Sequence, residues 1–347
     1  MNLSELNYFL TDNKQPNFRL KQIINAVYKE NYINFNDIQV LPIDLRDKLS
    51  ENFDIIPFTI DKILKSKDTL SYKALLITAD NKYIETVLIA AKNNTWSACV
   101  SSQIGCKLGC KFCATGNSGF TRDLSAEEIL GQVLFWKNYL SSNKLGKLTN
   151  IVYMGMGEPF LNWNNVSISL KKLIDPGLFD FSSRSISVST SGITDGIIKL
   201  ANEFDQVNLA ISLHSANDET RSKLMPINHK HNLNDLKQAL DYYTSKTNRK
   251  VFLEYIMLHK LTDTTEDADN LINFINSFEK KHLLHVNLIS YNTTASKYKA
   301  STKDEIEKFQ TYLQKNKINT TTRKSLGNEI NGACGQLSGN KPKDKTD

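Results

Sequence analysis

The sequence lacks long apolar runs: none approaches the length of about 18 residues that a membrane-spanning helix needs. Its first ten residues, MNLSELNYFL, include Glu5 and no basic residue, which argues against a secretory signal peptide. Cysteine is also scarce, because the chain has only five, an odd number with three of them clustered. This count does not suggest a disulfide framework, and we expect a protein of the reducing cytoplasm.

Histidine is scarce too, with six residues and none before His214. The sequence offers no Ser-His-Asp arrangement and no pair of metal-binding histidines, so a hydrolase has no support. His229 and His231 lie in the loop sequence NHKHN without nearby acidic ligands, which makes a metal site there improbable.

The net charge of +6 is unevenly distributed along the chain. Residues 1–90 hold 11 Lys and Arg against 12 Asp and Glu, whereas the remaining residues hold 32 against 25. The basic excess therefore lies on the part that carries the cysteines, and a polyanionic partner such as RNA fits it. On charge alone, a solvated lysine-rich surface explains the excess equally well.

Short β-rich runs alternate with amphipathic helical segments six times from Trp96 onward. The β-rich runs are WSACVSS, LTNIVYM, SISVSTS, VNLAISL, KVFLEYIML and HVNLISYN. Strands alternating with helices in this way predict a parallel sheet. We expect an α/β fold, a partial (β/α)6 TIM-like barrel open along one side, with its chemistry at the carboxyl ends of the strands.

Three regions follow from these patterns. Residues 1–90 are predicted to form a small α+β accessory domain, with two helices and then a hairpin that turns at Asp80 and Asn81. Residues 91–325 form the barrel core. Residues 326–347 form a C-terminal segment that carries Cys334 and ends in the polar tail SGNKPKDKTD, which we expect to be disordered.

Three of the five cysteines lie in the stretch IGCKLGCKFCATG, spaced C-x3-C-x2-C. A zinc site would need a fourth Cys or a His nearby, but Cys99 lies on a predicted strand and Cys334 is more than 200 residues away. Three thiolates also bind a [4Fe–4S] cluster, in which one iron then lacks a protein ligand. The spacing favours such a cluster, and a zinc-binding RNA-interaction module remains the alternative.

The cysteine motif, with Phe112 before the last cysteine, resembles that of radical S-adenosylmethionine (radical SAM) enzymes. Five further segments occur at the predicted strand ends and near the C-terminus: YMGMGEPFLN, SISVSTSG, AISLHSANDETRSKLMPIN, LISYN and GACGQLSGN. In this order they resemble the RlmN/Cfr family of radical SAM RNA methyltransferases, over nearly the whole chain. GMGEP and STSG look more like RlmN than like Cfr.

The resemblance implies cofactors and site residues. It implies one [4Fe–4S] cluster per chain, bound by Cys106, Cys110 and Cys113. The amine and carboxylate of SAM would then occupy the open iron, and two SAM molecules would be consumed per methylation. The matching SAM-binding residues are Gly157, Glu158, Ser189, Ser212, Leu213, His214 and Asn292. The matching catalytic residues are Cys334, Cys99 and Glu85.

The family's target is C2 or C8 of adenine, a ring carbon between nitrogens that is too electron-poor to attack the methyl group of SAM. The resemblance implies that Cys334 is first methylated, and that a 5′-deoxyadenosyl radical then removes hydrogen from its S-methyl group. The resulting radical adds to adenine and tethers the RNA to Cys334. Glu85 would remove the ring proton, and Cys99 would release the product by forming a disulfide with Cys334.

The implied partners are 23S rRNA, certain tRNAs modified at an adenosine beside the anticodon, and an electron-donating reductase or flavodoxin. We expect no membrane association and a monomer. The alternatives are a Cfr-type enzyme that methylates C8 and confers antibiotic resistance, and a radical SAM enzyme acting on a small molecule or a protein.

The single residues have ordinary interpretations as well. Without the family context, Cys99 would be a small buried hydrophobe, Glu85 a solvent-facing strand residue and His214 a structural histidine. Only the combination of all the motifs favours a functional role for these residues over their ordinary interpretations.

Overall fold

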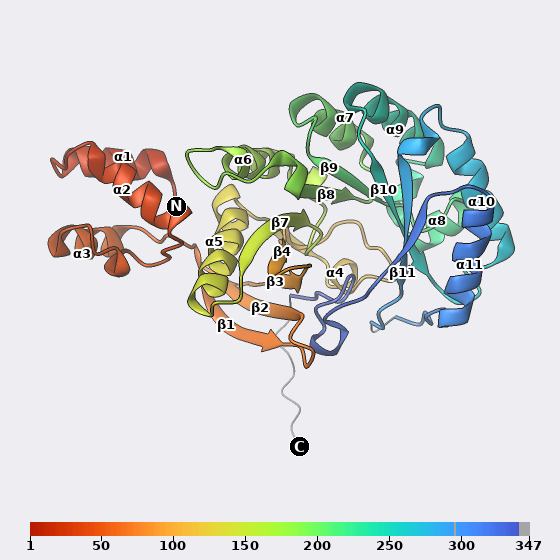
Figure 1. The fold of residues 1–347 in the computed structure, drawn as a ribbon, viewed down its shortest axis with the longest axis horizontal. Coiled ribbons are helices and arrows are strands. Elements are labelled where there is room, and N and C mark those ends of the chain that lie inside the picture. Colours follow the sequence, from red (N-terminus) through yellow and green to blue (C-terminus); the bar gives the residue numbers. More distant parts are fainter. Residues whose placement is uncertain (295, 340–347) are drawn as a thin grey trace, which may run out of the picture.

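The computed structural model describes residues 1–294 and 296–339 (Figure 1). The expected polar tail therefore lies outside the described residues from residue 340 onward. In the part of the chain that is described, no helix is long and apolar enough to cross a membrane.

Three helices open the chain and lie at one end of the molecule, beyond α5 (Figure 1). They are α1 (Leu3–Asp12), α2 (Phe18–Ile24) and α3 (Ile43–Asn52). Each buries leucine or isoleucine on one face, as the helical spacing of apolar residues predicts. Helix α5 (Ala126–Ser142) contacts the turn that follows α2, because the ammonium of Lys137 donates a hydrogen bond to the carbonyl oxygen of Tyr28 at 2.5 Å.

One ten-stranded sheet contains most of the strands, in the order β1-β2-β3-β4-β7-β8-β9-β10-β11-β12. The first four pair antiparallel: β1 (Phe58–Lys65), β2 (Ser71–Thr78), β3 (Tyr83–Ala90) and β4 (Thr95–Cys99). From β4 onward the pairing is parallel, through β7 (Lys147–Tyr153), β8 (Ile186–Thr190), β9 (Asn208–Ser212), β10 (Val251–Met257), β11 (Leu284–Ser290) and β12 (Thr320–Arg323).

A helix follows each of the six predicted barrel strands. These helices are α5 (Ala126–Ser142), α6 (Trp163–Ile174), α7 (Thr194–Glu203), α9 (Leu233–Thr247), α10 (Thr265–Asn276) and α11 (Lys303–Lys315). Four of them begin with a capping box, in which a side chain at the N-cap and one three residues later satisfy each other's backbone N–H groups. Ser125 with Glu128 is one example, and this local pairing defines where α5 starts.

The six β/α units confirm the predicted partial barrel. Within the described residues, β1 and β12 form the two edges of the sheet and do not pair with each other. Two features were not expected from the sequence: β12 adds a seventh parallel strand, and the accessory strands β1 to β3 extend the barrel sheet because β3 pairs with β4.

The hairpin of β2 and β3 forms where the sequence predicts it. Asn81 adopts a positive φ of 56° in the turn, a conformation that asparagine tolerates better than most residues.

The loops after the barrel strands meet at one end of the barrel. After β4, a small antiparallel pair, β5 (Gln103–Gly105) with β6 (Phe120–Asp123), brackets the three-cysteine stretch and the short helix α4 (Ala114–Asn117). After β9, the short helix α8 (Asp218–Leu224) follows. The fold thus brings the cysteine loop and the strand ends to the same place.

Candidate active site

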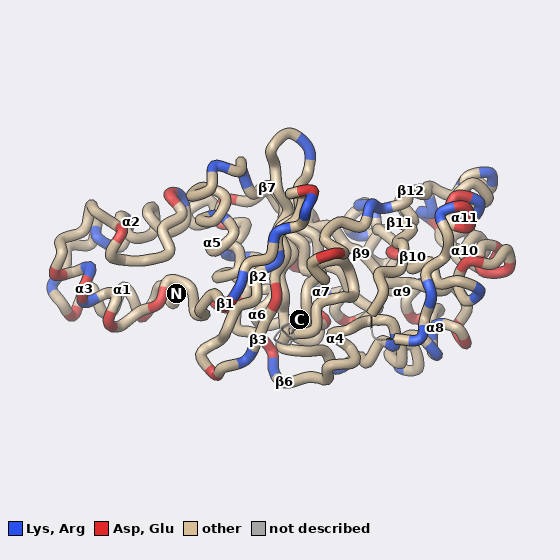
Figure 2. Tube along the Cα trace, turned by 90° about the horizontal axis from the view of Figure 1, so that it is seen from below, with Lys and Arg blue, Asp and Glu red and all other residues tan. Residues whose placement is uncertain are grey.

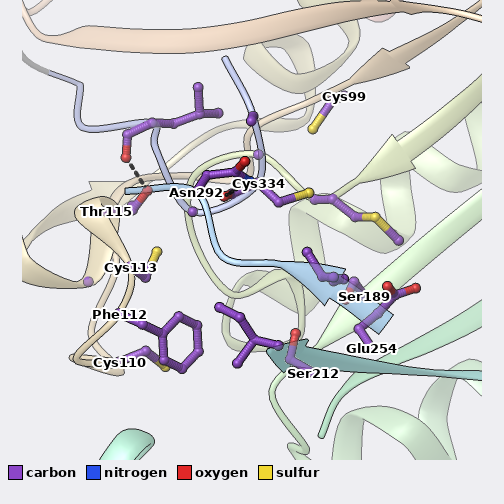
Figure 3. Close-up of a pocket in the computed structure, with 18 of the residues that line it drawn as sticks. Cys99, Cys110, Phe112, Cys113, Thr115, Ser189, Ser212, Glu254, Asn292 and Cys334 are labelled. Atoms are coloured by element: carbon purple, nitrogen blue, oxygen red, sulfur yellow. Dashed lines mark hydrogen bonds between the residues drawn. The ribbon is translucent and has the colours of Figure 1, made fainter. Parts of the chain in front are cut away.

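A pocket lies at the carboxyl ends of the parallel strands, as expected for a barrel of this kind. Its wall includes the last or near-last residues of all six barrel strands: Cys99, Tyr153, Ser189, Thr190, Ser212, Ile256 and Ser290. The cysteine loop and the C-terminal segment add Cys106, Cys110, Cys113 and Cys334 to the wall. Figure 3 shows the last three of these residues.

The cysteine loop is held by backbone hydrogen bonds and by aromatic packing. The amide of Cys106 donates to the carbonyl oxygen of Gly119 at 2.8 Å, and the amide of Cys113 donates to that of Cys110 at 3.2 Å. Phe112 is buried and packs edge-on against His214, with ring centroids 4.9 Å apart. The aromatic residue of the motif therefore anchors the loop to the end of β9.

The three loop thiols line one pocket, and the stretch IGCKLGCKFCATG offers no fourth cysteine or histidine for a closed zinc site. Burial raises the pKa of Cys106 to about 12 and raises that of Cys110 as well, and neighbouring thiols add to both shifts. A bound cationic group is what would stabilise the thiolates here, as metal ligation requires. The donor set thus suits a [4Fe–4S] cluster with three protein ligands.

Cys99 and Cys334 come from distant parts of the sequence and line the same pocket. Cys99 is the buried last residue of β4, and burial raises its pKa to about 12, with a further increase from Cys334. Cys334 is a free thiol that raises the pKa of Cys99, and Cys113 adds to the increase in the pKa of Cys334. Figure 3 shows it between these two residues. Enclosure in the pocket raises the pKa of Cys334, and the Arg323 guanidinium opposes this increase.

The segment around Cys334 is bonded to the cysteine loop and to the end of β11. The carbonyl oxygen of Gly335 accepts from the amide of Ala114 at 2.8 Å, and that of Leu337 accepts from the Thr115 hydroxyl at 2.5 Å (Figure 3). Asn292 donates from its side-chain amide to the carbonyl oxygen of Cys334 at 3.2 Å. The predicted SAM-binding residue Asn292 thus also supports the Cys334 backbone.

The GMGEP sequence after β7 packs tightly against the protein's own chain. Gly157 has φ +98°, and a Cβ at this position would lie 2.5 Å from the Cβ of Gln103. The close neighbour that requires a glycine here is therefore the segment after β4. The adjacent Glu158 is buried and accepts backbone hydrogen bonds from Ser191 at 2.8 Å and Phe160 at 3.2 Å. Burial raises the pKa of Glu158.

His214 faces the pocket as a neutral imidazole. Its Nδ1 accepts the backbone N–H of Ile256 at 3.2 Å, so the ring proton lies on Nε2. Burial lowers the pKa of His214 to about 3, and the positive charge of Arg221 contributes. The residue adopts a left-handed backbone conformation with φ +60°. His214 is therefore a fixed hydrogen-bond donor on the pocket wall.

Two of the predicted site residues do not line the pocket. Leu213 is fully buried, and its backbone amide donates to the carbonyl oxygen of Glu254 at 3.0 Å. Glu85 is 1% exposed and forms an ion pair with Lys73 at 2.7 Å, so the interpretation of Glu85 as a solvent-facing strand residue is wrong.

Several residues of the site were missed in the sequence. Arg221 is completely buried and donates to the carbonyl oxygens of Ser191 at 2.7 Å and Leu213 at 3.1 Å, which ties the ends of β8 and β9 together. It lies within the segment AISLHSANDETRSKLMPIN, so the motif contained the signal.

An ion pair of the pocket wall was also missed. Glu254 of β10 and Arg323 of β12 both line the pocket and form an ion pair at 3.1 Å. No local sequence pattern marks this pair, because the two residues are 69 positions apart and β12 itself was not predicted.

Comparisons with known proteins agree with this site. Residues 100–275 match the model of the radical SAM superfamily, a span that includes the cysteine loop and the first strand ends. The match to this family and the three-cysteine loop together show that the protein is a radical SAM enzyme.

Proteins that are similar to this chain over nearly its full length show which radical SAM enzymes it is related to. The chain is 40% identical to a probable dual-specificity RNA methyltransferase RlmN of Carboxydothermus hydrogenoformans, over 97% of this chain and 96% of the relative. It is also 40% identical to a ribosomal RNA large subunit methyltransferase Cfr of Staphylococcus warneri, over 96% and 95%. A crystal structure of a radical SAM methyltransferase from Sphaerobacter thermophilus aligns with a TM-score of 0.92 and 35% identity, covering 98% of each chain. The chain belongs to the RlmN/Cfr family of radical SAM RNA methyltransferases.

Proposed function

We propose that this methyltransferase modifies C2 of an adenosine in 23S rRNA, and of an adenosine beside the anticodon of certain tRNAs. The observation that carries the proposal is the meeting of Cys99 and Cys334 in one pocket with the three loop cysteines. A methyltransferase acting by simple displacement on a nucleophilic atom has no use for two additional thiols at its site. A reaction that tethers its substrate and then releases it needs both.

The cofactors would be held by residues already described. Cys106, Cys110 and Cys113 would hold one [4Fe–4S] cluster, which when bound supplies the electron that cleaves SAM. SAM would lie against the strand ends, with Gly157, Glu158, Ser189, Ser212, His214 and Asn292 in contact with it. Two SAM molecules per product, one for Cys334 and one for the radical, are part of the proposal.

The chain's own residues have distinct tasks. Cys334 carries the methyl carbon to the adenine and becomes bonded to the RNA. Glu85 removes the proton from the adenine ring. Cys99 then attacks the sulfur of Cys334 as a thiolate, so that a disulfide forms and the bond between Cys334 and the carbon breaks; the carbon keeps the electron pair of this bond and takes up a proton to become the methyl group. This last step fits two free thiols that line the same pocket.

RNA as the substrate is supported by the names of the relatives and by the charges near the pocket. Arg323 and Lys324 line the pocket. Figure 2 shows further lysine and arginine residues around β11 and β12. An electron-donating reductase or flavodoxin, a cytoplasmic location and a monomeric state complete the proposal.

The choice of C2 rests on the sequences GMGEP and STSG, which resemble RlmN. Relatives named RlmN and Cfr are equally similar to this chain, at 40% identity. The test is to incubate the reconstituted enzyme with unmodified 23S rRNA and with tRNA, digest the RNA, and identify methyladenosines by mass spectrometry. We expect 2-methyladenosine from both, and a product with 8-methyladenosine alone would show a Cfr-type enzyme instead. Methylation of free adenosine without RNA would favour a small-molecule substrate.

A further inference from the structure

A buried ion pair joins the hairpin strands beneath the C-terminal segment. The ammonium of Lys73 on β2 lies 2.7 Å from the carboxylate of Glu85 on β3, with side chains 6% and 2% exposed. Lys73 pairs in register with Val87, and Glu85 with Leu75, so the two charged residues are diagonal neighbours on one face of the sheet. A buried ion pair of this kind rarely stabilises a fold more than apolar residues would, which points to a role in specifying one arrangement.

The pair holds both ends of the segment that carries Cys334. The second carboxylate oxygen of Glu85 accepts the backbone N–H groups of Ser338 at 2.7 Å and Gly339 at 3.1 Å. Lys73 donates a second hydrogen bond, at 3.2 Å, to the carbonyl oxygen of Asn331. Asn331 precedes Cys334 by three residues, and Ser338 follows it by four. One charged pair therefore fixes the spacing of the two ends of the loop.

The same row of the sheet contains Cys99. Lys73 pairs with Val87, and Val87 pairs in turn with Cys99, so Lys73 and Cys99 lie in one row on the same face of the sheet, with Val87 between them. Leu337 of the C-terminal segment packs on Val87, Cys99 and Met156. The position of Cys334 relative to Cys99 thus depends on how the segment is anchored to this row.

We propose that Lys73 is a positioning residue of the reaction, which acts through Glu85 to hold the Cys334 segment in place opposite Cys99. The inference rests on the proposed function of Cys334 and Cys99. Lys73 holds the buried carboxylate in one orientation, and Glu85 in turn accepts hydrogen bonds from the two amides at the far end of the loop.

This arrangement also covers Glu85 in the resting enzyme. Its carboxylate already accepts three hydrogen bonds, about three quarters of its capacity, and it does not reach the pocket wall.

The test compares Lys73→Met, which keeps the length of the side chain and removes its charge, with Lys73→Arg, which keeps the charge. Lys62→Met is the matched control, because Lys62 is an exposed lysine on the neighbouring strand β1. The measurement on the holoenzyme is hydrogen–deuterium exchange of the peptide that contains Ser338 and Gly339, with peptides of β9 and β10 as internal references. Methylation of Cys334 and of the RNA is measured on the same preparations.

In Lys73→Met we expect exchange at residues 338–339 to accelerate about tenfold or more. Without Lys73 the carboxylate of Glu85 is no longer held in place, so its hydrogen bonds to the two amides are lost. The reference peptides should keep their protection, and RNA methylation per bound cluster should fall while SAM affinity stays unchanged. Lys73→Arg should restore most of the protection, and Lys62→Met should match the unmodified enzyme. If Lys73→Met instead destabilised the whole fold, exchange would accelerate in all peptides. Lys73→Arg would then not restore protection at residues 338–339 in particular.

Unchanged protection of residues 338–339 in Lys73→Met would overturn the inference. If Lys73→Met does not fold, Glu85→Gln takes its place, and the same acceleration is expected because an amide nitrogen would face either Lys73 or the two N–H groups. If the unmodified enzyme failed to methylate RNA, the proposed function would be wrong, and the exchange data would still show whether Lys73 anchors the segment. Normal RNA methylation with no change in exchange would refute the anchoring alone.

Discussion

The neutral state of His214 predicts a specific dependence of stability on pH. Burial holds the pKa of the folded imidazole at about 3, whereas the unfolded chain has the ordinary value of 6.5. Below pH 6.5 the unfolded state therefore binds a proton that the folded state excludes. The contribution of His214 is fully present above pH 6.5 and is lost as the pH falls toward 3.

The size of the effect follows from the two pKa values. Each pH unit inside this window costs about 1.4 kcal/mol, so the change from pH 7.5 to 5.0 should remove about 2 kcal/mol from the free energy of unfolding. His214→Asn is the matched variant. Asparagine tolerates the positive φ of this position, offers an oxygen to the N–H of Ile256, and does not titrate.

The assay is urea unfolding of the cluster-free protein and of His214→Asn at both pH values. The variant also loses the contact of the imidazole with Phe112, but this loss is the same at both pH values and cancels in the comparison. We expect the unmodified protein to lose about 2 kcal/mol more than the variant on acidification. The same loss in both proteins would refute the assignment of His214 as a buried neutral donor.

Three further perturbations test other parts of the site. Cys110→Ala removes one of three ligands, and we expect loss of bound iron after anaerobic reconstitution; stoichiometric iron in the variant would contradict the cluster assignment. Arg221→Lys loses the planar fork that reaches Ser191 and Leu213, and unfolding in urea should show a loss of roughly 2–4 kcal/mol from the unsatisfied carbonyl groups. RNA binding should weaken about tenfold or more between about 50 and 200 mM salt, since two phosphate contacts suffice for this change; a flat response would count against RNA as the substrate.

Much of the barrel could be predicted because its strands and helices are specified by residues close together in the sequence. The apolar runs and the helical spacing define strands and helices, and capping residues such as Ser125 and Thr264 define where the helices start. The cysteine loop could be placed on the reactive face because it follows the first barrel strand, and parallel strands end at one edge.

The environment of Glu85 could not be predicted from the neighbouring sequence. In the alternating run KYIETVLI, Glu85 has the position of a solvent-facing residue, yet both faces of β3 are covered. The cover comes from Ser338 and Gly339, more than 250 positions later. Arg221 was missed for a related reason, because its burial depends on contacts with two separate loops. Contacts of this range depend on the folded topology, which no window of the sequence contains.

The central claim is that Cys334 bonds covalently to the RNA and that Cys99 releases it. The most direct measurement is denaturing gel electrophoresis of Cys99→Ala after reaction with rRNA, SAM and a reductant, with and without ribonuclease. The account predicts a protein–RNA species that survives denaturation, disappears with ribonuclease, and is absent when Cys334 is also replaced by alanine. Normal turnover of Cys99→Ala without any such species would contradict the account and leave Cys99 as a packed residue at the end of β4.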